Sequence, residues 1–188
     1  MLGTFIVSTV NQKILILLAK YCDEEFYERQ VARDLGIAFG SANRSLNQLY
    51  AAGALRRRQK GRMYFYSIET SNPAIKEFKK LINMVLLEPL VEKLKAVSNR
   101  VVLYGSCAQG TDTSKSDIDL FVVSNNKKRS SDIISKAVFP QGFTNLRVKP
   151  VIKTPVELLQ AGESEKAYLE EVERGIVLWE NVANEPGI

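Results

Sequence analysis

The chain has 188 residues, of which 45% are hydrophobic and 25% charged, a balance that excludes global disorder and fits one ordinary domain or two small ones. It contains no histidine, so histidine-dependent catalytic triads and histidine metal sites are excluded. Two cysteines, Cys22 and Cys107, are too few for a disulfide framework and form no CxxC zinc motif. The net charge of +5 is uneven: residues up to Val97 sum to +6 and the remainder to −1. A basic first half favours a polyanionic partner.

We expect a cytoplasmic protein with no membrane partner. The longest apolar run near the start of the chain, Ile14–Ala19, is far shorter than the roughly 20 residues that cross a bilayer. No basic segment followed by an apolar run and a cleavage pattern is present.

Three helices are predicted in the first part of the chain. Apolar residues at helical spacing predict the first over Asn11–Cys22. The second is predicted over Glu28–Leu35 and ends at Gly36, which suits the left-handed conformation of a helix C-cap. The third is predicted over Gly40–Gly53, with a serine expected at its N-cap.

The third predicted helix has an apolar face formed by Ala42, Leu46 and Leu49. Its other side is polar and contains no acid; the residues there are Ser41, Asn43, Arg44, Asn47 and Gln48. Arginine, asparagine and glutamine side chains can pair with the edges of DNA bases. Two short helices joined by a tight turn, the second of them with this polar face, fit a helix-turn-helix.

A basic hairpin is predicted directly after the third helix. Its strands are Ala54–Arg62 and Met63–Ile68, and Lys60-Gly61 suits the turn between them. Cations gather around its tip with no acid among them: Arg56, Arg57, Arg58, Lys60 and Arg62. Such a group can neutralise the phosphates of a nucleic acid backbone.

Residues 10–70 resemble a winged helix-turn-helix of the kind found in small prokaryotic transcription regulators. The resemblance implies that residues 1–71 form a DNA-binding domain whose polar helix face and basic hairpin contact DNA. The alternative is a three-helix protein–protein module whose basic hairpin is only solvated. Because the polar face and the basic hairpin occur together, DNA binding is the favoured interpretation.

A long connecting helix is predicted over residues 72–97. Asn72-Pro73 suits a helix start, and apolar residues continue at helical spacing as far as Val97. Pro89 is expected to end or kink this helix. Such a helix fits either a homodimerisation element or a packing element between two domains, and the sequence leaves both open.

The clearest chemical motif lies between two apolar strands. Arg100–Tyr104 runs directly into Gly105 and Ser106, and Asp117 and Asp119 open the next strand. Alternation along a strand places the two aspartates on one face, close enough to share a divalent cation. Glycine allows the backbone to approach a phosphate, and serine adds a hydroxyl and an N–H group. Oxygen ligands that face such a turn fit Mg²⁺-assisted nucleotidyl transfer.

The segments Leu103–Gly110 and Ser116–Leu120 together resemble the DNA polymerase beta nucleotidyltransferase superfamily, above all its minimal, stand-alone prokaryotic domains. The resemblance predicts a nucleotidyltransferase-like domain over residues 98–188, with a mixed sheet flanked by helices. It implies Mg²⁺ or Mn²⁺ with a nucleoside triphosphate as the bound group. The residues that it assigns to nucleotide binding are Gly105, Ser106 and Ser116, and those that it assigns to the metal and to catalysis are Asp117 and Asp119.

One part of the superfamily's site is not found in the sequence. The resemblance implies a third carboxylate on a later strand, but the candidate strand Asn145–Ile152 has Arg147 and Lys149 at its outward positions. Two aspartates can still hold one Mg²⁺–nucleotide, because Mg²⁺ keeps several waters. Glu157 is near in sequence but is predicted in the first turn of a helix. Nucleotide binding is therefore better supported than catalysis.

The rest of the second half is interpreted as structural. Ser130–Asp132 is expected to cap a short helix, and further helices are predicted over Pro155–Gln160 and Glu163–Glu173. Gly175–Trp179 is a final apolar segment. Deletion of residues 1–71 is expected to leave a folded fragment.

The sequence thus predicts an α+β protein with a winged helix-turn-helix, a connecting helix and a nucleotidyltransferase-like domain. Three functions stay open. The first is an enzyme that transfers NMP from an NTP to a hydroxyl acceptor and is directed by its DNA-binding unit. The second is a non-enzymatic transcription regulator that senses nucleotide. The third is an antitoxin-like protein that pairs with a toxin-like partner.

Overall fold

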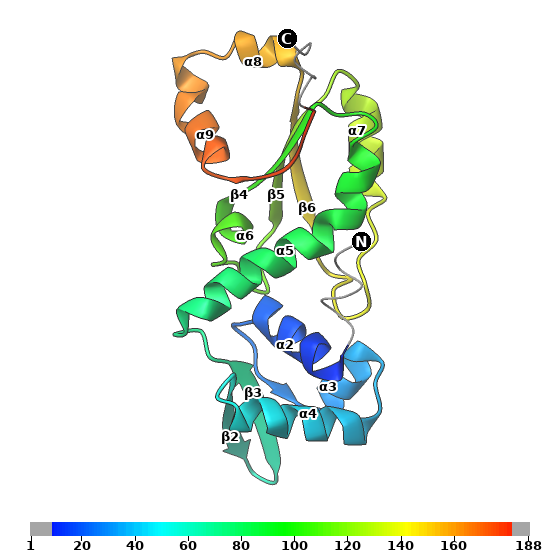
Figure 1. Cartoon of the computed structure of the whole chain (residues 1–188), viewed down its shortest axis with the longest axis vertical. Coiled ribbons are helices and arrows are strands. Elements are labelled where there is room, and N and C mark those ends of the chain that lie inside the picture. Colours follow the sequence, from blue (N-terminus) through cyan, green and yellow to red (C-terminus); the bar gives the residue numbers. More distant parts are fainter. Residues whose placement is uncertain (1–8, 182–188) are drawn as a thin grey trace, which may run out of the picture. The chain divides into compact units, whose positions relative to one another are not determined.

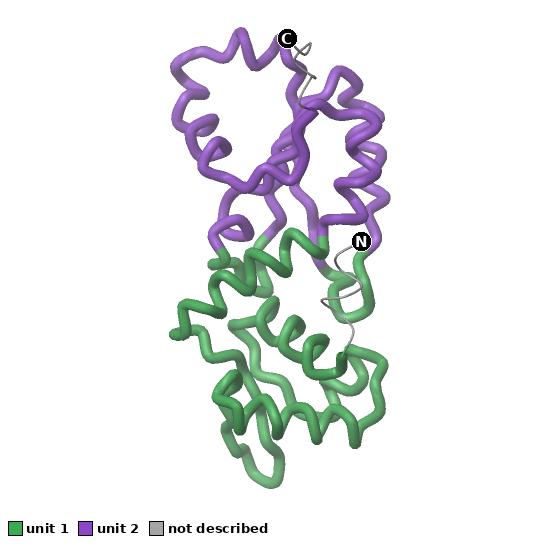
Figure 2. Tube along the Cα trace, in the orientation of Figure 1, with its two compact units in different colours: residues 1–86, 110–116, 139–145 green, residues 87–109, 117–138, 146–188 purple. Residues whose placement is uncertain are grey.

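A computed structural model describes residues 9–181, and this part of the chain has a mixed α+β architecture with eight helices and two sheets (Figure 1). The ends of the two predicted domains, residues 1–8 and 182–188, lie outside the described residues. The chain divides into two compact units (Figure 2). Unit 1 consists of the residues up to Leu86 with segments 110–116 and 139–145, and unit 2 of residues 87–109, 117–138 and those from Leu146 onward. None of the described helices is long and apolar enough to cross a membrane.

Unit 1 begins with three helices at nearly the predicted positions. Its elements are α2 (Val10–Lys20), β1 (Phe26–Tyr27), α3 (Glu28–Leu35), α4 (Phe39–Ala51), β2 (Leu55–Lys60), β3 (Met63–Ile68) and the first part of α5 (Pro73–Leu94). α2 begins one residue earlier than predicted because Thr9 and Gln12 form a capping box. α3 has the predicted bounds and ends at Gly36, whose φ of 61° is left-handed.

α4 differs from the prediction at its start. The helix begins at Phe39, and its N-cap is Ala38, whose side chain makes no capping hydrogen bond. The expected serine N-cap is therefore wrong, because the extended backbone of Ala38 already starts the helix before Ser41. The predicted apolar face is correct in its first turns, since Ala42 and Leu46 are fully buried.

Three antiparallel strands form the sheet of unit 1 in the order β1-β3-β2. Lys60 pairs with Met63, so Gly61 and Arg62 form the two-residue turn, one residue later than predicted. Gly61 has a φ of 61°, which glycine adopts without strain. The residues that this sheet buries are Phe26, Leu55, Tyr66 and Ile68. One face of the hairpin is therefore fixed by packing and the other is exposed.

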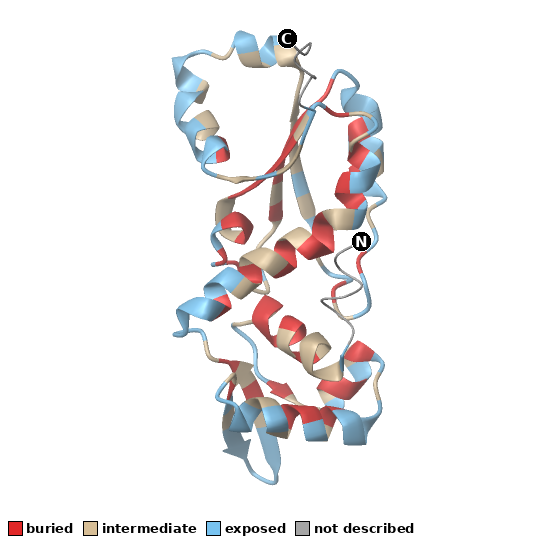
Figure 3. Ribbon diagram, in the orientation of Figure 1, coloured by how far each residue is buried: buried red, intermediate tan, exposed pale blue. Residues whose placement is uncertain are grey.

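α5 passes through Pro89 and continues to Leu94, so the proline does not end the helix. Proline removes one backbone hydrogen bond and destabilises a helix interior. Residues before and after it are buried, and their packing compensates for this cost; Figure 3 shows buried residues along α5. They are Leu86, Leu87, Leu90, Val91 and Leu94.

Unit 2 is built on a four-stranded sheet in the order β6-β5-β4-β7. After the end of α5, its elements are β4 (Arg100–Tyr104), α6 (Gly105–Gln109), β5 (Ile118–Val123), α7 (Lys127–Ser135), β6 (Val148–Lys153), α8 (Pro155–Leu159), α9 (Glu163–Glu173) and β7 (Ile176–Glu180). β4 pairs antiparallel with β5 and with β7, whereas β6 is parallel to β5. A parallel pair requires a long crossover connection, and α7 lies in it.

One face of this sheet holds a compact apolar cluster under α8 and α9. Its buried members are Val102, Tyr104, Phe121, Val123 and Val172, and the partly buried side chains packed on them include Leu158, Tyr168 and Leu169. Because alternate residues of a strand share a face, Asp119 of β5 lies on the same side as Phe121. The cluster thus supports the end of the sheet from which this aspartate projects.

The N-cap of α7 lies four residues before the predicted cap. Asn126 is its N-cap and accepts a hydrogen bond from the N–H of Arg129, so the predicted Ser130–Asp132 cap is wrong. Ser130 lies inside the helix and is fully buried, and its hydroxyl donates to the Ser124 hydroxyl at 2.9 Å. Because the buried hydroxyl of Ser130 has this hydrogen-bond partner, the serine is tolerated inside the helix and does not cap it.

Two segments of unit 1 come from far along the chain. In the first, Asp112 is fully buried and pairs with Lys20 at 2.7 Å. In the second, Phe143 stacks on Tyr21 with 6.4 Å between ring centroids, and the Tyr21 hydroxyl donates to the Gly142 carbonyl at 3.1 Å. Unit 1 therefore depends on residues that precede β5 in the chain and on residues that follow it.

Deletion of residues 1–71 should yield an aggregated or unfolded fragment, the opposite of the outcome expected from the sequence. The deletion removes Lys20, the nearer of the two lysines that pair with Asp112 (2.7 Å, against 3.7 Å for Lys79), and breaking a buried ion pair costs about 3–5 kcal/mol. It also exposes the Phe143 ring that stacks on Tyr21. Size-exclusion chromatography and circular dichroism of fragment 72–188, beside the full chain, measure this. A monodisperse fragment with a cooperative urea transition would contradict it.

Candidate functional site

The pairing of β4 with β5 brings the two halves of the motif together. Tyr104 lies opposite Asp119, and the chain turns into α6 at Gly105 with a φ of 67°. A Cβ atom on Gly105 would lie 2.8 Å from Oδ2 of Asp119. The missing side chain therefore leaves the space that the Asp119 carboxylate occupies.

Asp117 and Asp119 are both partly buried at the start of β5. Burial raises the pKa of Asp119 above its usual range. The nearby charge of Lys149 opposes this rise, whereas the charges of Asp117 and Glu171 add to it. A bound cation would relieve the repulsion between the carboxylates, so the pair has the electrostatics of a cation ligand set.

The strand beside β5 supplies cations where a third acid was sought. Parallel pairing places Lys149 of β6 next to Asp119, and the backbone carbonyl of Arg147 accepts a hydrogen bond from the N–H of Ile118 at 2.8 Å. Within residues 9–181, no group of three or more histidine, cysteine, aspartate or glutamate side chains is arranged to hold a metal ion. Two carboxylates thus form the acidic part of the site.

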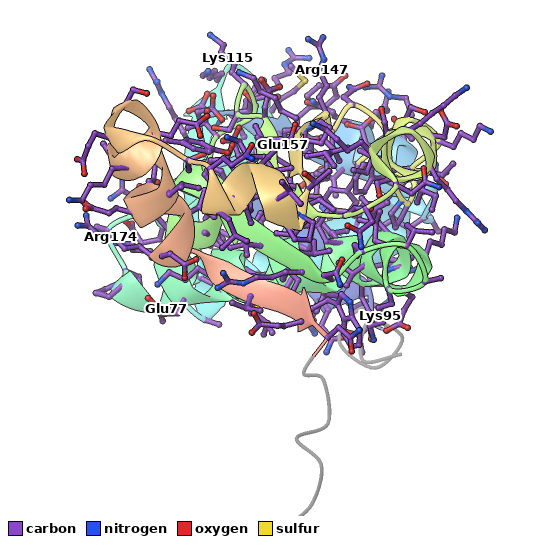
Figure 4. The ribbon with its side chains drawn as sticks, turned by 90° about the horizontal axis from the view of Figure 1, so that it is seen from above. Glu77, Lys95, Lys115, Arg147, Glu157 and Arg174 are labelled. Carbon is purple, nitrogen blue, oxygen red and sulfur yellow. The ribbon has the colours of Figure 1, made fainter. Side chains whose placement is uncertain are left out.

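Glu157, the acid nearest in sequence to this strand, is engaged elsewhere. It lies in the first turn of α8, as predicted, and is labelled there in Figure 4. Its carboxylate accepts a hydrogen bond from the Thr154 N–H at 2.7 Å and pairs with Lys127 at 2.8 Å. The hydrogen bond from Lys127 is the largest influence on the pKa of Glu157, which these contacts lower to about 2. Capping the helix is therefore its role.

Glu171 of α9 is an acid that the sequence did not single out. Tyr168, one turn earlier, donates its hydroxyl to that of Tyr104 at 3.2 Å, and Val172 is buried against the sheet. Burial raises the pKa of Tyr104, and the charges of Asp119 and Glu171 raise it further. The charge of Glu171 thus raises the pKa of both Tyr104 and Asp119, although its side chain is exposed. Its place depends on the docking of α9, which helical periodicity does not predict.

The serines of the motif have different surroundings. Ser116 closes a turn with Thr113: its hydroxyl accepts from the Thr113 N–H at 2.9 Å, and its own N–H donates to the Thr113 carbonyl at 3.1 Å. Ser106 lies in α6 and is partly buried. The next residue, Cys107, is fully buried, and its thiol donates to the Asp117 carbonyl at 3.5 Å. The turn and the aspartates are thus linked through this thiol as well.

The basic hairpin presents its cations unequally. Arg56 forms two hydrogen bonds with Glu69, and Lys60 pairs with Glu25 and lies over the Phe65 ring. Arg58 and Arg62 are exposed and, in the described part of the chain, form no ion pair or hydrogen bond through their side chains. The hairpin therefore offers these two cations most directly to a partner.

Arg57 has an internal role. Its guanidinium lies between the rings of Tyr50 and Tyr64, 4.2 Å and 4.5 Å from their centroids. It also donates to the Asn47 side-chain oxygen at 3.2 Å. Arg57 thus joins the hairpin to α4, and two of the predicted DNA contacts bind each other.

The polar face of α4 is partly engaged in the same way. Asn43 donates to Glu28 at 2.8 Å, and Asn47 donates to the Asn43 carbonyl at 3.0 Å. Gln48 accepts a weak hydrogen bond from Asn11 at 3.3 Å. Two exposed residues on this face form no side-chain hydrogen bond or ion pair within residues 9–181; they are Ser41 and Arg44.

Comparisons with known proteins identify the class of the second part of the chain. Residues 84–176 match the family model described as "Nucleotidyltransferase domain". None of the curated proteins compared with the chain matches it. The chain therefore contains a nucleotidyltransferase-family domain, and this domain includes the Gly105 turn and both aspartates.

Two solved structures, both from Sulfolobus solfataricus, are similar to parts of the chain. A candidate nucleotidyltransferase is 19% identical with a TM-score of 0.36, over 60% of this chain and 91% of its own. Sso10a-2, a DNA-binding protein, is 24% identical with a TM-score of 0.31, over 47% of this chain and 94% of its own. At such TM-scores neither likeness extends to the function of this chain.

Replacing Gly105 with alanine should lower the free energy of unfolding by about 1–3 kcal/mol. The new Cβ would meet Oδ2 of Asp119, and alanine is strained at a φ of 67°. Gly40→Ala is the control, because Gly40 lies inside α4 with open space around it and should gain about 0.5–1 kcal/mol. Urea unfolding measures both. Equal stabilities of the two variants would show that Asp119 does not depend on this space.

Proposed function

We propose that the nucleotidyltransferase domain binds a nucleoside triphosphate with Mg²⁺ or Mn²⁺ at the turn between β4 and β5. The observation that supports this most is the closeness of Gly105 to Asp119, since a Cβ atom on Gly105 would lie 2.8 Å from Oδ2 of Asp119. A carboxylate thus lies against a glycine turn, and glycine lets a ligand approach the backbone closely. Asp117 and Asp119 are the proposed metal ligands. The nucleotide contacts that we propose are Gly105, Ser106 and Ser116.

In this proposal the chain's own residues bind and orient the nucleotide. Carboxylate oxygens are hard ligands that fit Mg²⁺, and when bound the metal neutralises charge on the phosphates. Lys149, beside Asp119, can add a charge-assisted hydrogen bond to a phosphate oxygen. A lysine ammonium has no lone pair, so it cannot take the proton of an attacking hydroxyl as a third carboxylate would.

We therefore propose that transfer of NMP to a hydroxyl is slow or absent. Glu157 is held by Lys127 and by its own helix cap, and it is not available as a base. Glu171 influences Asp119 through its charge but forms no three-carboxylate group with the aspartates among the described residues. These observations favour the second candidate function, a regulator that senses nucleotide without turnover. Pairing with a second copy or with a toxin-like protein stays a prediction of the sequence.

We also propose that residues 1–71 are a winged helix-turn-helix that binds DNA, and that residues 98–188 act as the nucleotide domain. The exposed cations Arg44, Arg58 and Arg62 support this, because in the described part of the chain their guanidinium groups form no hydrogen bond or ion pair and are available to phosphates or bases. Arg58 acts on Glu25 only through its charge. Arg57 and Asn47 have internal partners, so in this proposal they support the shape of the surface.

The first expected result concerns the metal. ATP should bind with a Kd between micromolar and millimolar, about 4–8 kcal/mol, and only in the presence of Mg²⁺. The double variant Asp117→Asn with Asp119→Asn should lose this binding and stay folded. Because the pKa of Asp119 is raised, its protonated form should weaken metal binding as the pH falls through that value. Calorimetric titration measures the affinities.

Glu157→Gln is the control for the loss of a carboxylate, since Glu157 is a helix cap, and it should leave ATP affinity unchanged. Equal affinity of the wild type and the double variant for ATP, with and without Mg²⁺, would reject the proposed site. Rapid transfer of labelled AMP to an acceptor would instead reject the proposal that turnover is slow or absent.

The second expected result concerns DNA. Arg58→Ala with Arg62→Ala should weaken binding to all DNA duplexes alike and reduce the slope of log affinity against log salt by about 2, since each lost phosphate contact contributes about 0.9. Arg44→Ala should cost about 1–3 kcal/mol at particular base pairs. Arg57→Ala should instead lower the free energy of unfolding by about 1–2 kcal/mol, because it removes the contacts that join the hairpin to Tyr50 and Asn47 of α4. Fluorescence anisotropy and urea unfolding separate these effects.

Lys128→Ala with Lys136→Ala is the matched control, because it removes two exposed cations from another part of the chain and changes the net charge equally. Its DNA affinity should stay close to that of the wild type. If both double variants weaken binding to the same extent, only total charge matters, and the proposed surface is wrong.

A further inference from the structure

Unit 1 contains a cluster of four polar side chains that are almost completely removed from water. Its members are Lys20, Lys79, Asn83 and Asp112, none of them more than 5% exposed. We call them the buried polar cluster. The first comes from the end of α2, the next two come from α5, and the last comes from the segment 110–116. Three distant parts of the sequence therefore meet at one point inside this unit.

Asp112 is the centre of the cluster. Its Oδ2 atom accepts from the Lys20 ammonium at 2.7 Å, and its Oδ1 atom accepts from the Asn83 amide at 3.1 Å. Lys20 also donates to the Asn83 carbonyl oxygen at 2.9 Å, so these three side chains form a closed ring of hydrogen bonds. Lys79 donates to the backbone carbonyl of Asp112, and its ammonium also pairs with Oδ1 of the same residue at 3.7 Å. The side chain and the backbone of Asp112 are thus both held by hydrogen bonds.

The neighbours of Asp112 are held as well. Gly110 lies so close to α5 that a Cβ atom on it would be 2.2 Å from the Lys76 carbonyl oxygen. The Ser114 N–H and hydroxyl both donate to the Asp23 carboxylate at 2.8 Å. Partial burial acts to raise the pKa of Asp23, but the hydrogen bonds from Ser114 outweigh it, and the pKa is lowered. The segment 110–116 is therefore fixed at three places along its length.

This segment joins the two halves of the proposed nucleotide site. It begins directly after α6, which holds Gly105 and Ser106, and it ends at Ser116, which Asp117 follows in the chain. Thr113 and Ser116 close its last turn by two hydrogen bonds. Fixing Asp112 thus limits the positions open to the residues that lead into the metal ligands.

Stability alone does not account for the buried polar cluster. Burial of an ion pair carries a large desolvation cost, and well-packed apolar side chains of similar volume are often as stabilising or more so. An ion pair with this ring of hydrogen bonds defines one geometry, which apolar contacts specify less sharply.

We propose that Lys20 and Asp112 are positioning residues of the nucleotide site: they hold the segment 110–116 so that Ser116 and Asp117 take the positions that bind the metal–nucleotide complex. The proposal rests on the proposed nucleotide binding. It assigns a role in that site to a residue of α2, in the part of the chain that we propose binds DNA.

The test uses the full chain with Asp112→Asn, and with Lys20→Met and Lys79→Met combined with Asp112→Asn, which removes all three buried charges and leaves no unpaired buried lysine. Two quantities are measured: amide hydrogen exchange of residues 113–119 without ligand, and the Kd of Mg²⁺–ATP. We expect exchange to become about tenfold faster and the Kd to rise about tenfold, the change that ~1.4 kcal/mol of lost positioning gives. Val31→Ala, a cavity in the core of α3, is the control for general destabilisation and should change neither.

Each outcome has one meaning. Exchange at the wild-type rate in both Asp112 variants would overturn the positioning role, whatever the ATP result. Faster exchange with an unchanged Kd would overturn its link to the nucleotide, and so would an equal rise in Kd for Val31→Ala. A wild type that binds no Mg²⁺–ATP would overturn the proposed function, and exchange alone would then decide whether Lys20 and Asp112 hold the segment.

Discussion

The antiparallel pairing of β4 with β5 is the constraint on which the candidate site depends. It sets Asp119 opposite Tyr104, and the turn that follows β4 then reaches the carboxylate only because Gly105 has no side chain. The same pairing puts Tyr104 and Phe121 on the face that α8 and α9 cover, so the core and the site share two strands. On the next strand, the parallel register places Lys149 beside Asp119 and determines which chemistry the site can support.

Much of the fold could be predicted because local signals and packing agree. The glycine C-cap of α3 at Gly36 and the strand Arg100–Tyr104 were found with their bounds. The prediction is wrong where a residue type can have several structural roles and the commonest role was assigned to it. Ser130 resembles a helix cap but is a buried helix residue, and Pro89 was expected to end or kink a helix that buried leucines carry past it. Membership of 110–116 in unit 1 has no local signal, since it depends on a contact between Lys20 and Asp112 across 92 positions.

For the candidate site, spacing predicted which residues lie together but not how each is paired. Gly105 and Asp119 are in contact, in accordance with the prediction from the strand pattern. The sequence could not separate Arg57, which is held between two tyrosines, from Arg58, which is exposed, because both belong to one basic run. It could not identify Glu171 either, since the charge of this residue reaches Asp119 only after α9 has packed on the sheet.

The interleaving of the two units has a consequence for synthesis of the chain. A ribosome releases Lys20 and Tyr21 long before their partners Asp112 and Phe143, so the core of unit 1 cannot be completed when its own helices emerge. Until residue 145 has been made, Lys20 stays hydrated and the ring of Tyr21 stays exposed to solvent. Unit 1 therefore folds completely only after most of the nucleotidyltransferase domain has been translated. In a chain that stops before residue 145, neither unit can fold completely.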